Sequence, residues 1–167
     1  MPKSAICSLN SWAEKNEFTT KFYDIDMLYP SDEEIEKYFK EVNADVVGLS
    51  AVVSTSYKQV KRLAKIIKKV NKKTFIVCGG YLTAAANTVL RKTEIDLCVV
   101  GNGEVAWVGV LKFMKQHLED EKNEIDINEL LKVQGIAVLD NDNLRFSGYG
   151  GTLSSCNMTF PDFEYLK

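Results

Sequence analysis

Short apolar runs rich in β-branched residues alternate with longer helix-forming segments, and this alternation constrains the fold more than any other feature of the chain. The short runs lie at 45–50, 74–78 and 96–100. Between them, 56–71 repeats its apolar residues at the spacing of one helix face, and 82–91 is rich in alanine. Such alternation is typical of βαβ units on a parallel sheet. We therefore expect an α/β fold with a doubly wound, mostly parallel sheet.

Local signals place further elements on either side of these units. Ser31, followed by three acidic residues, supplies an N-cap and a favourable first turn for a helix. Near the other end, the Asx-rich run at 140–143 separates two apolar segments and predicts a hairpin loop. The further predicted elements are a strand at 22–26, helices at 31–42 and 104–118, and a C-terminal β-hairpin with strands at 134–139 and 144–146.

Size and charge limit the organisation of the chain and its partners. The 167 residues suffice for one compact domain, which we expect at 1–146, and the Gly- and Ser-rich segment 147–167 is predicted to be a linker or tail. Lys and Arg (21) nearly balance Asp and Glu (23), so bulk charge does not attract nucleic acid or a membrane surface. No apolar run has the length of a membrane span, and the start lacks a signal-peptide core. We expect a cytoplasmic protein with neither nucleic-acid nor membrane partners.

One face of the predicted helix at 56–71 carries a dense row of cations. A phosphate group or a nucleic acid is one interpretation of such a face. The acid-rich helix predicted just before it balances the charge, however, so we expect an ordinary solvated surface. The cations are Lys58, Lys61, Arg62, Lys65, Lys68 and Lys69.

The cysteines and the histidine do not form a catalytic or metal-binding set. Cys7, Cys78, Cys98 and Cys156 are separated by tens of residues and include no CxxC pair. Cys78 and Cys98 lie in apolar runs, where we expect buried free thiols. His117, the single histidine, lies late in a predicted helix, where a cation is favourable. We predict no catalytic residue and no metal held by side chains of this chain.

The ends of three predicted strands carry residues that suit a ligand. In an open parallel sheet, ligands bind beyond the carboxyl ends of the strands. Small and hydroxyl side chains follow the first strand, a Gly pair exposes backbone after the second, and a Gly-rich turn opens a helix after the third. Together they predict a broad platform for a large flat cofactor. The candidate cofactor-binding residues are Ser50, Val52, Ser54, Gly79, Gly80, Tyr81, Gly101, Asn102, Gly103 and Glu104.

Motifs of several other ligand-binding classes are missing. A phosphate-accepting receiver domain would carry an aspartate in place of Ser50. No GxxxxGK[ST] loop occurs, and the turn at 101–103 does not complete GxGxxG because Ala106 occupies the last position. Receiver domains, nucleotide hydrolases and ordinary dehydrogenases are therefore disfavoured.

Several short motifs occur in a specific order along residues 18–167. Asp45–Ser50 reads D-V-V-G-L-S, Val77–Ala84 contains a Gly-Gly turn, and Ile95–Glu104 ends in G-N-G-E. Gly135–Ala137 and Phe160–Phe163 follow as a short hairpin segment and F-P-D-F. As a set they resemble the cobalamin-binding domain at the N-terminus of cobalamin-dependent radical S-adenosylmethionine (SAM) enzymes.

This resemblance implies a Rossmann-type three-layer sandwich with flavodoxin-like strand order. Cobalamin would be held at the carboxyl edge of the sheet by the ten candidate residues named above. A radical SAM catalytic domain in cis would follow, and the iron–sulfur cluster and SAM would belong to that domain. Its CxxxCxxC motif does not occur in this chain. We expect no catalytic activity from the chain alone.

Three features depart from the family pattern. The DxHxxG motif of methyltransferase-type cobalamin domains is missing, which implies base-off cobalamin without a lower histidine. Asn102 replaces an acid, and Ala106 stands where threonine or proline is common. The family opens with a strand, but 5–13 favours a helix over a strand at 4–9, because that strand would leave too few residues for a crossover.

These departures leave a second interpretation open. The chain could keep the fold without the cofactor and act as a scaffold that positions a substrate or a partner. Side chains filling the strand ends would favour this scaffold, whereas a bare edge favours cobalamin.

Overall fold

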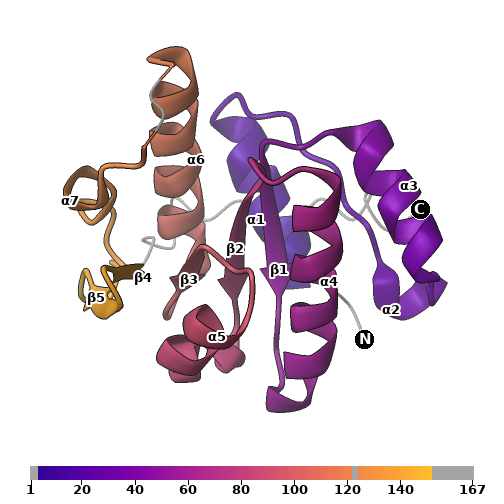
Figure 1. Cartoon of the computed structure of the whole chain (residues 1–167). Coiled ribbons are helices and arrows are strands. Elements are labelled where there is room, and N and C mark those ends of the chain that lie inside the picture. Colours follow the sequence, from indigo (N-terminus) through magenta and orange to yellow (C-terminus); the bar gives the residue numbers. More distant parts are fainter. Residues whose placement is uncertain (1–3, 122–123, 152–167) are drawn as a thin grey trace. The chain divides into compact units, whose positions relative to one another are not determined.

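The computed structural model describes residues 4–121 and 124–151, and it divides them into two compact units. The sheet unit comprises residues 24–100 and 137–146, and the helical unit comprises the other described residues. We describe each unit separately (Figure 1). The helices are α1 (Ser4–Lys15), α2 (Ile25–Leu28), α3 (Asp32–Val42), α4 (Tyr57–Val70), α5 (Ala86–Lys92), α6 (Gly103–Glu119) and α7 (Ile127–Leu130), with 3₁₀ turns η1 (Ser54–Ser56) and η2 (Tyr81–Ala85). The strands are β1 (Val46–Ser50), β2 (Phe75–Gly79), β3 (Leu97–Val99), β4 (Ile136–Asp140) and β5 (Asn143–Phe146).

The strands form one mixed, mostly parallel sheet in the order β1-β2-β3-β4-β5. β1 and β2 are parallel, and their register places Ser50 beside Gly79. β2 and β3 are also parallel, with Cys78 beside Cys98. The carboxyl ends of neighbouring parallel strands therefore meet at one edge, as the sequence predicts. The predicted α/β class is confirmed.

The C-terminal hairpin is also confirmed, with a tighter turn than expected. β4 and β5 pair in antiparallel fashion. Asn141 and Asp142 join them, with φ values of 46° and 64°. Left-handed backbone at both positions is typical of a two-residue type I′ turn, which Asn and Asp tolerate better than other non-glycine residues. The predicted loop of four residues is thus a turn of two.

Helices α3 and α4 form where the sequence predicts helices. The Ser31 side chain accepts a hydrogen bond from the Glu34 N–H, and the Glu34 side chain accepts from the Ser31 N–H, which completes a capping box. The inner face of α4 buries Leu63 and Ile67, and each such side chain stabilises the fold by about 1.5–3 kcal/mol. In the sheet unit, α4 and α5 lie on the same side of the sheet, and α3 packs beside α4 (Figure 1).

In the helical unit, α1 packs against α6. The predicted helix at 5–13 is confirmed as α1, and its buried residues are Cys7, Asn10 and Ala13. Within the described residues, no strand precedes β1. The short α7 begins after Asp126, whose side chain accepts hydrogen bonds from two backbone N–H groups.

Two predicted elements differ from the structure. The strand predicted at 22–26 is wrong, because Asp24 caps α2 there by accepting hydrogen bonds from the N–H groups of Asp26 and Met27. The helix predicted at 82–91 begins as the 3₁₀ turn η2 and becomes α-helical only in α5. The last part of the predicted tail, 152–167, lies outside the described residues, as do Cys156 and the F-P-D-F segment.

Candidate functional site

The ends of β1 and β2 lie side by side in the sheet unit. Ser50 is the last residue of β1 and Gly79 the last of β2, and the two are register partners. The parallel ladder continues one step further, because the Ala51 N–H donates a hydrogen bond of 2.8 Å to the Gly79 carbonyl. Val52 therefore leaves the sheet directly beside the Gly79–Gly80 turn. The structure thus brings two of the three predicted groups of residues together.

Gly80 is required by the way these two strand ends meet. Its φ is +96°, and a Cβ atom there would lie 2.5 Å from the Ala51 carbonyl oxygen. The Leu82 N–H donates to the same oxygen at 3.2 Å, and the Thr83 hydroxyl donates to the Gly80 carbonyl at 2.7 Å. These contacts fix the turn after β2 against the segment after β1.

The surface at these strand ends combines glycine backbone without side chains and exposed apolar groups. A Cβ atom on Gly79 would meet no atom of the described residues within 4 Å. Val52 is 56% exposed and Tyr81 82% exposed, and Ser50 is exposed as well. Exposed apolar side chains next to open backbone suit contact with a large, flat and largely apolar ligand.

Val53 is also exposed here, although it is not among the cofactor-binding residues predicted from the sequence. Its side chain is 54% exposed. Ser54, one of the predicted cofactor-binding residues, is the first residue of η1, and its backbone lies in that 3₁₀ turn. The sequence does contain a signal for Val53. Two consecutive valines follow the end of a buried strand, where polar and small turn residues are usual, and such apolar residues are candidates for ligand contact.

The third predicted group, Gly101 to Glu104, lies in the helical unit and is described by itself. Gly101 has a φ of +93°, and Asn102 is the N-cap of α6 with extended backbone. The Asn102 side chain makes no capping hydrogen bond, unlike those of Ser31 and Asp126 at α3 and α7. A Cβ atom on Gly103 would contact the Leu9 side chain of α1 at 3.4 Å. The Gly residues here thus serve a tight turn and close helix packing.

The predicted roles of Cys78 and Cys98 as core residues are confirmed. Both side chains are fully buried. A hydrogen bond with Cys78 raises the pKa of the Cys98 thiol, and burial raises it further. Such a thiol stays protonated and is a poor nucleophile.

His117 lies in the last turn of α6, where its ring stacks on Phe113 with centroids 6.2 Å apart. Within residues 4–121 and 124–151, no three His, Cys, Asp or Glu side chains are grouped as metal ligands. None of the helices in this part of the chain combines the length and the apolar character that crossing a bilayer requires.

Similar proteins of known structure share this architecture. The radical SAM methyltransferase TsrM of Kitasatospora setae, solved with its tryptophan substrate and a SAM analogue, matches 87% of this chain with a TM-score of 0.73 at 13% identity. A second TsrM structure, solved with cobalamin and a [4Fe-4S] cluster, matches 87% with a TM-score of 0.68 at 16% identity. The matched regions cover 27% and 28% of the TsrM chains. The likeness shows a common Rossmann-like fold.

Two methyltransferases are similar in sequence. The uncharacterized methyltransferase PH0819 of Pyrococcus horikoshii is 34% identical over 114 residues, which are 67% of this chain and 22% of that protein. The cytidylyl-2-hydroxyethylphosphonate methyltransferase of Streptomyces wedmorensis is 26% identical over 113 residues, which are 67% of this chain and 19% of that protein. The chain thus spans about a fifth of the length of the curated relatives that it matches.

The match to a family profile agrees with the sequence motifs and with the strand ends. The profile of the B12 binding domain matches residues 1–111, which is more than half of the chain. The resemblance to cobalamin-binding domains stated from the sequence is confirmed: the chain belongs to the family of B12-binding domains.

Proposed function

We propose that the chain is the cobalamin-binding module of a radical SAM enzyme and that cobalamin rests on the ends of β1 and β2. The observation that carries this proposal is the open backbone of Gly79 between exposed apolar side chains. An open, apolar strand edge at the position where α/β sheets bind ligands suits a corrin ring.

The residues at this edge fit the chemistry of the cofactor. Val52 and Tyr81 offer apolar surface, the bare backbone at Gly79 permits close approach, and Ser50 offers a hydroxyl group. Cobalamin, when bound, would supply a cobalt centre for alkyl-transfer chemistry. The role of these residues is to bind and orient the cofactor and to exclude water from the face that they cover. Gly80 holds the edge in shape through its contact with Ala51.

Two finer features of the binding mode belong to the same proposal. The sequence contains one histidine, His117, and its ring stacks on Phe113 in α6. We therefore propose base-off cobalamin without a lower histidine, so that the chain holds the metal only through the corrin. The contacts predicted for Ser54 and for Gly101, Asn102, Gly103 and Glu104 remain predictions.

The activity of the whole protein is proposed from its relatives. Both curated relatives are named as methyltransferases and extend well beyond the matched region. We propose a radical SAM domain in cis that carries the iron–sulfur cluster and SAM, with 1–146 as the cobalamin-binding domain, 147–167 as the linker, and no catalysis by this module alone. A cytoplasmic location is proposed because the buried Cys78 and Cys98 are free thiols. The scaffold without cofactor is disfavoured, since no described side chain lies within 4 Å of a Cβ atom placed on Gly79.

A spectroscopic titration tests cobalamin binding. Addition of the chain to hydroxocobalamin should change the corrin absorbance spectrum in a saturable way. Gly79→Leu should weaken this binding by about tenfold or more, because the side chain would occupy the open backbone. Gly151→Leu is the matched control, since a Cβ atom there also meets nothing within 4 Å and its φ is not positive. An unchanged spectrum at high protein concentration, or equal loss in both variants, would overturn the proposal.

A further inference from the structure

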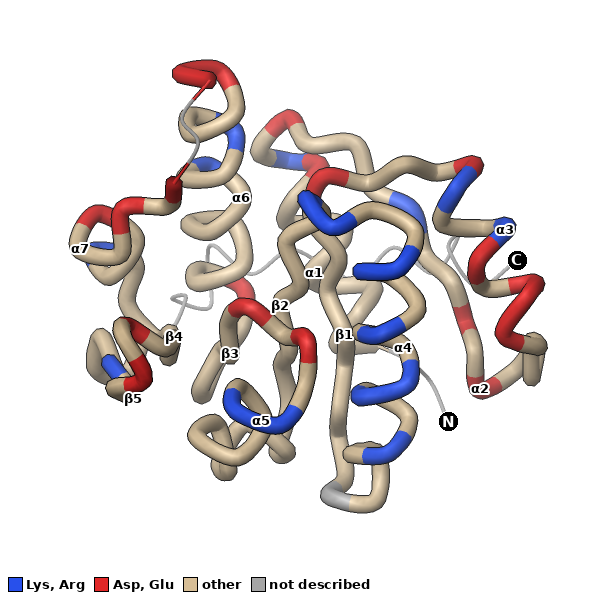
Figure 2. Tube along the Cα trace, viewed as in Figure 1, with Lys and Arg blue, Asp and Glu red and all other residues tan. Residues whose placement is uncertain are grey.

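The outer surface of α4 carries cations that no described carboxylate neutralises. Lys58, Lys61 and Lys65 lie on this helix at spacings of three and four residues, so they share one face. Lys72 follows two residues after the helix ends. All four are exposed, and none makes an ion pair with a described residue. Figure 2 shows the basic positions, in blue, recurring along α4. We call these four residues the lysine row.

The other cations of α4 are already neutralised. Arg62 donates to Asp32 of α3 at 2.6 Å, and Lys69 forms an ion pair with Glu36 of the same helix. Lys68 bridges to Asp96 at 2.7 Å. The acid-rich α3 thus balances one flank of α4, and Asp96 balances one further cation. The expectation that α3 would balance the whole basic face is correct only for the flank that α3 covers.

We propose that the lysine row is a docking surface for an acidic helix of a partner protein. α4 already binds one acidic helix, α3, through ion pairs along one flank, and the lysine row offers the same chemistry on its outer side. A partner helix with Glu or Asp at spacings of three and four residues would meet the three row lysines on α4, and Lys72 lies just beyond the end of that helix. Because the contacts are exposed ion pairs, binding is expected to be weak, rapid and sensitive to salt.

The surroundings of the row favour an acidic helix over a nucleic acid. Arg62 on the neighbouring flank is paired with Asp32 of α3, so the unpaired cations form a short stretch on the outer side of α4 and not a continuous basic surface for a chain of phosphates. The only aromatic residue of α4 is Tyr57 at its first position, so the helix offers no series of rings for bases to stack on. The net charge of the chain, −2, adds no general attraction for a polyanion.

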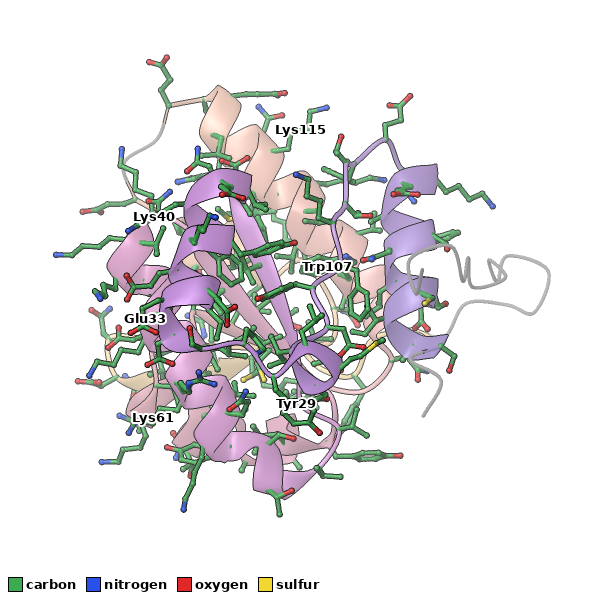
Figure 3. The ribbon with its side chains drawn as sticks, turned by 90° about the vertical axis from the view of Figure 1, so that its right-hand side faces the viewer. Tyr29, Glu33, Lys40, Lys61, Trp107 and Lys115 are labelled. Carbon is green, nitrogen blue, oxygen red and sulfur yellow. The ribbon has the colours of Figure 1, made fainter. Side chains whose placement is uncertain are left out.

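A binding assay with a matched charge control tests the proposal. The probe is a fluorescein-labelled Ala/Glu helical peptide with glutamates on one face, followed by anisotropy at low and moderate salt. The row variant Lys58→Gln/Lys61→Gln/Lys65→Gln/Lys72→Gln should bind about tenfold more weakly or worse. The control variant Lys21→Gln/Lys40→Gln/Lys112→Gln/Lys115→Gln loses the same charge from other exposed sites and should change binding less than twofold. Figure 3 shows Lys61 together with two control positions, Lys40 and Lys115.

Further arms distinguish the proposed partner from other binders. Replacing the four row lysines with arginine should retain binding, and a peptide with its glutamates scattered around the helix should bind more weakly. Equal losses in the row and control variants, or tighter binding of duplex DNA than of the peptide, would overturn the proposal. If the wild type self-associates in analytical ultracentrifugation and the row variant does not, the row binds a second copy of this chain and the proposal of an acidic partner helix is overturned. The hydroxocobalamin titration should be unchanged in the row variant, so the two proposals fail separately.

Discussion

The backbone of Gly80 lies directly against the carbonyl group of Ala51. A Cβ atom on Gly80 would lie 2.5 Å from that oxygen, and its φ of +96° is itself unfavourable for any other residue. Gly80→Ala should therefore destabilise the protein by about 2–4 kcal/mol, through steric conflict and backbone strain together. Urea unfolding followed by circular dichroism measures the change in the free energy of unfolding.

The adjacent glycine provides the control for this prediction. A Cβ atom on Gly79 meets nothing within 4 Å, and its φ is not positive. Gly79→Ala should change the free energy of unfolding by less than about 0.5 kcal/mol. If both variants lose the same stability, the close approach of Gly80 to Ala51 is not what requires glycine there.

The ion pair between Lys68 and Asp96 connects α4 to the segment before β3. The Asp96 carboxylate accepts from the Lys68 ammonium at 2.7 Å and from the buried Ile76 N–H at 2.7 Å. Asp96→Ala would leave both donors without this acceptor and should cost about 2–3 kcal/mol. Asp96→Asn keeps an oxygen in the same place and should cost much less. If the two variants lose the same free energy of unfolding, the hydrogen bond that Asp96 accepts from the Ile76 N–H does not contribute to stability.

The same carboxyl group should contribute to the pH dependence of stability. Burial raises the pKa of Asp96, and this effect outweighs the lowering by Lys68 and the Ile76 N–H. In the window just above its ordinary value of 3.8, the folded state therefore binds the proton more tightly than the unfolded state. The contribution of Asp96 to stability is greatest at low pH and falls as pH rises through this window. Urea unfolding at a series of pH values should show this fall in the wild type, and Asp96→Asn should lack it.

The elements that the sequence predicts well are those whose signal is local. The apolar spacing of 56–71 predicts α4 within one residue at each end, because one buried helix face sets both the pattern and the structure. At 22–26, Phe22, Tyr23 and Ile25 favour a strand by type. The Asp24 side chain instead bonds the N–H groups that follow it, and this local capping starts α2.

For the candidate site, the sequence predicts which residue types lie at the strand ends, but not the local backbone conformation or the exposure of each side chain. The rule that parallel strands end at one edge places Ser50 near Gly79, and the register confirms that arrangement. The 3₁₀ start of the next helix could not be predicted. It depends on the hydrogen bond from the Leu82 N–H to Ala51, a residue 31 positions away in the sequence. The exposure of Val53 likewise depends on the path of the chain after β1.

The thiol of Cys98 should be inert in the folded protein. It is fully buried, and the hydrogen bond with Cys78 and burial both raise its pKa. Because the thiolate is the reactive form, iodoacetamide should label Cys98 in urea but not in the native state at neutral pH. A Cys156→Ser background removes the cysteine outside the described residues from the measurement, and mass spectrometry locates the label. Rapid native labelling of Cys98 would contradict the buried position in β3.

Asn10 should be a site where a polar residue lowers stability. Its side chain is 8% exposed on the buried face of α1, and its Nδ2 atom has no hydrogen-bond partner among the described residues. An unpaired buried donor costs free energy, so Asn10→Leu, which keeps the branched shape and the number of side-chain heavy atoms, should stabilise the protein by about 1 kcal/mol. Ser11→Ala on the same helix is the control with the opposite sign, because the Ser11 hydroxyl donates to the Cys7 carbonyl at 2.8 Å. Urea unfolding compares the two variants with the wild type. Destabilisation by Asn10→Leu would mean that an ordered water satisfies Nδ2 in solution.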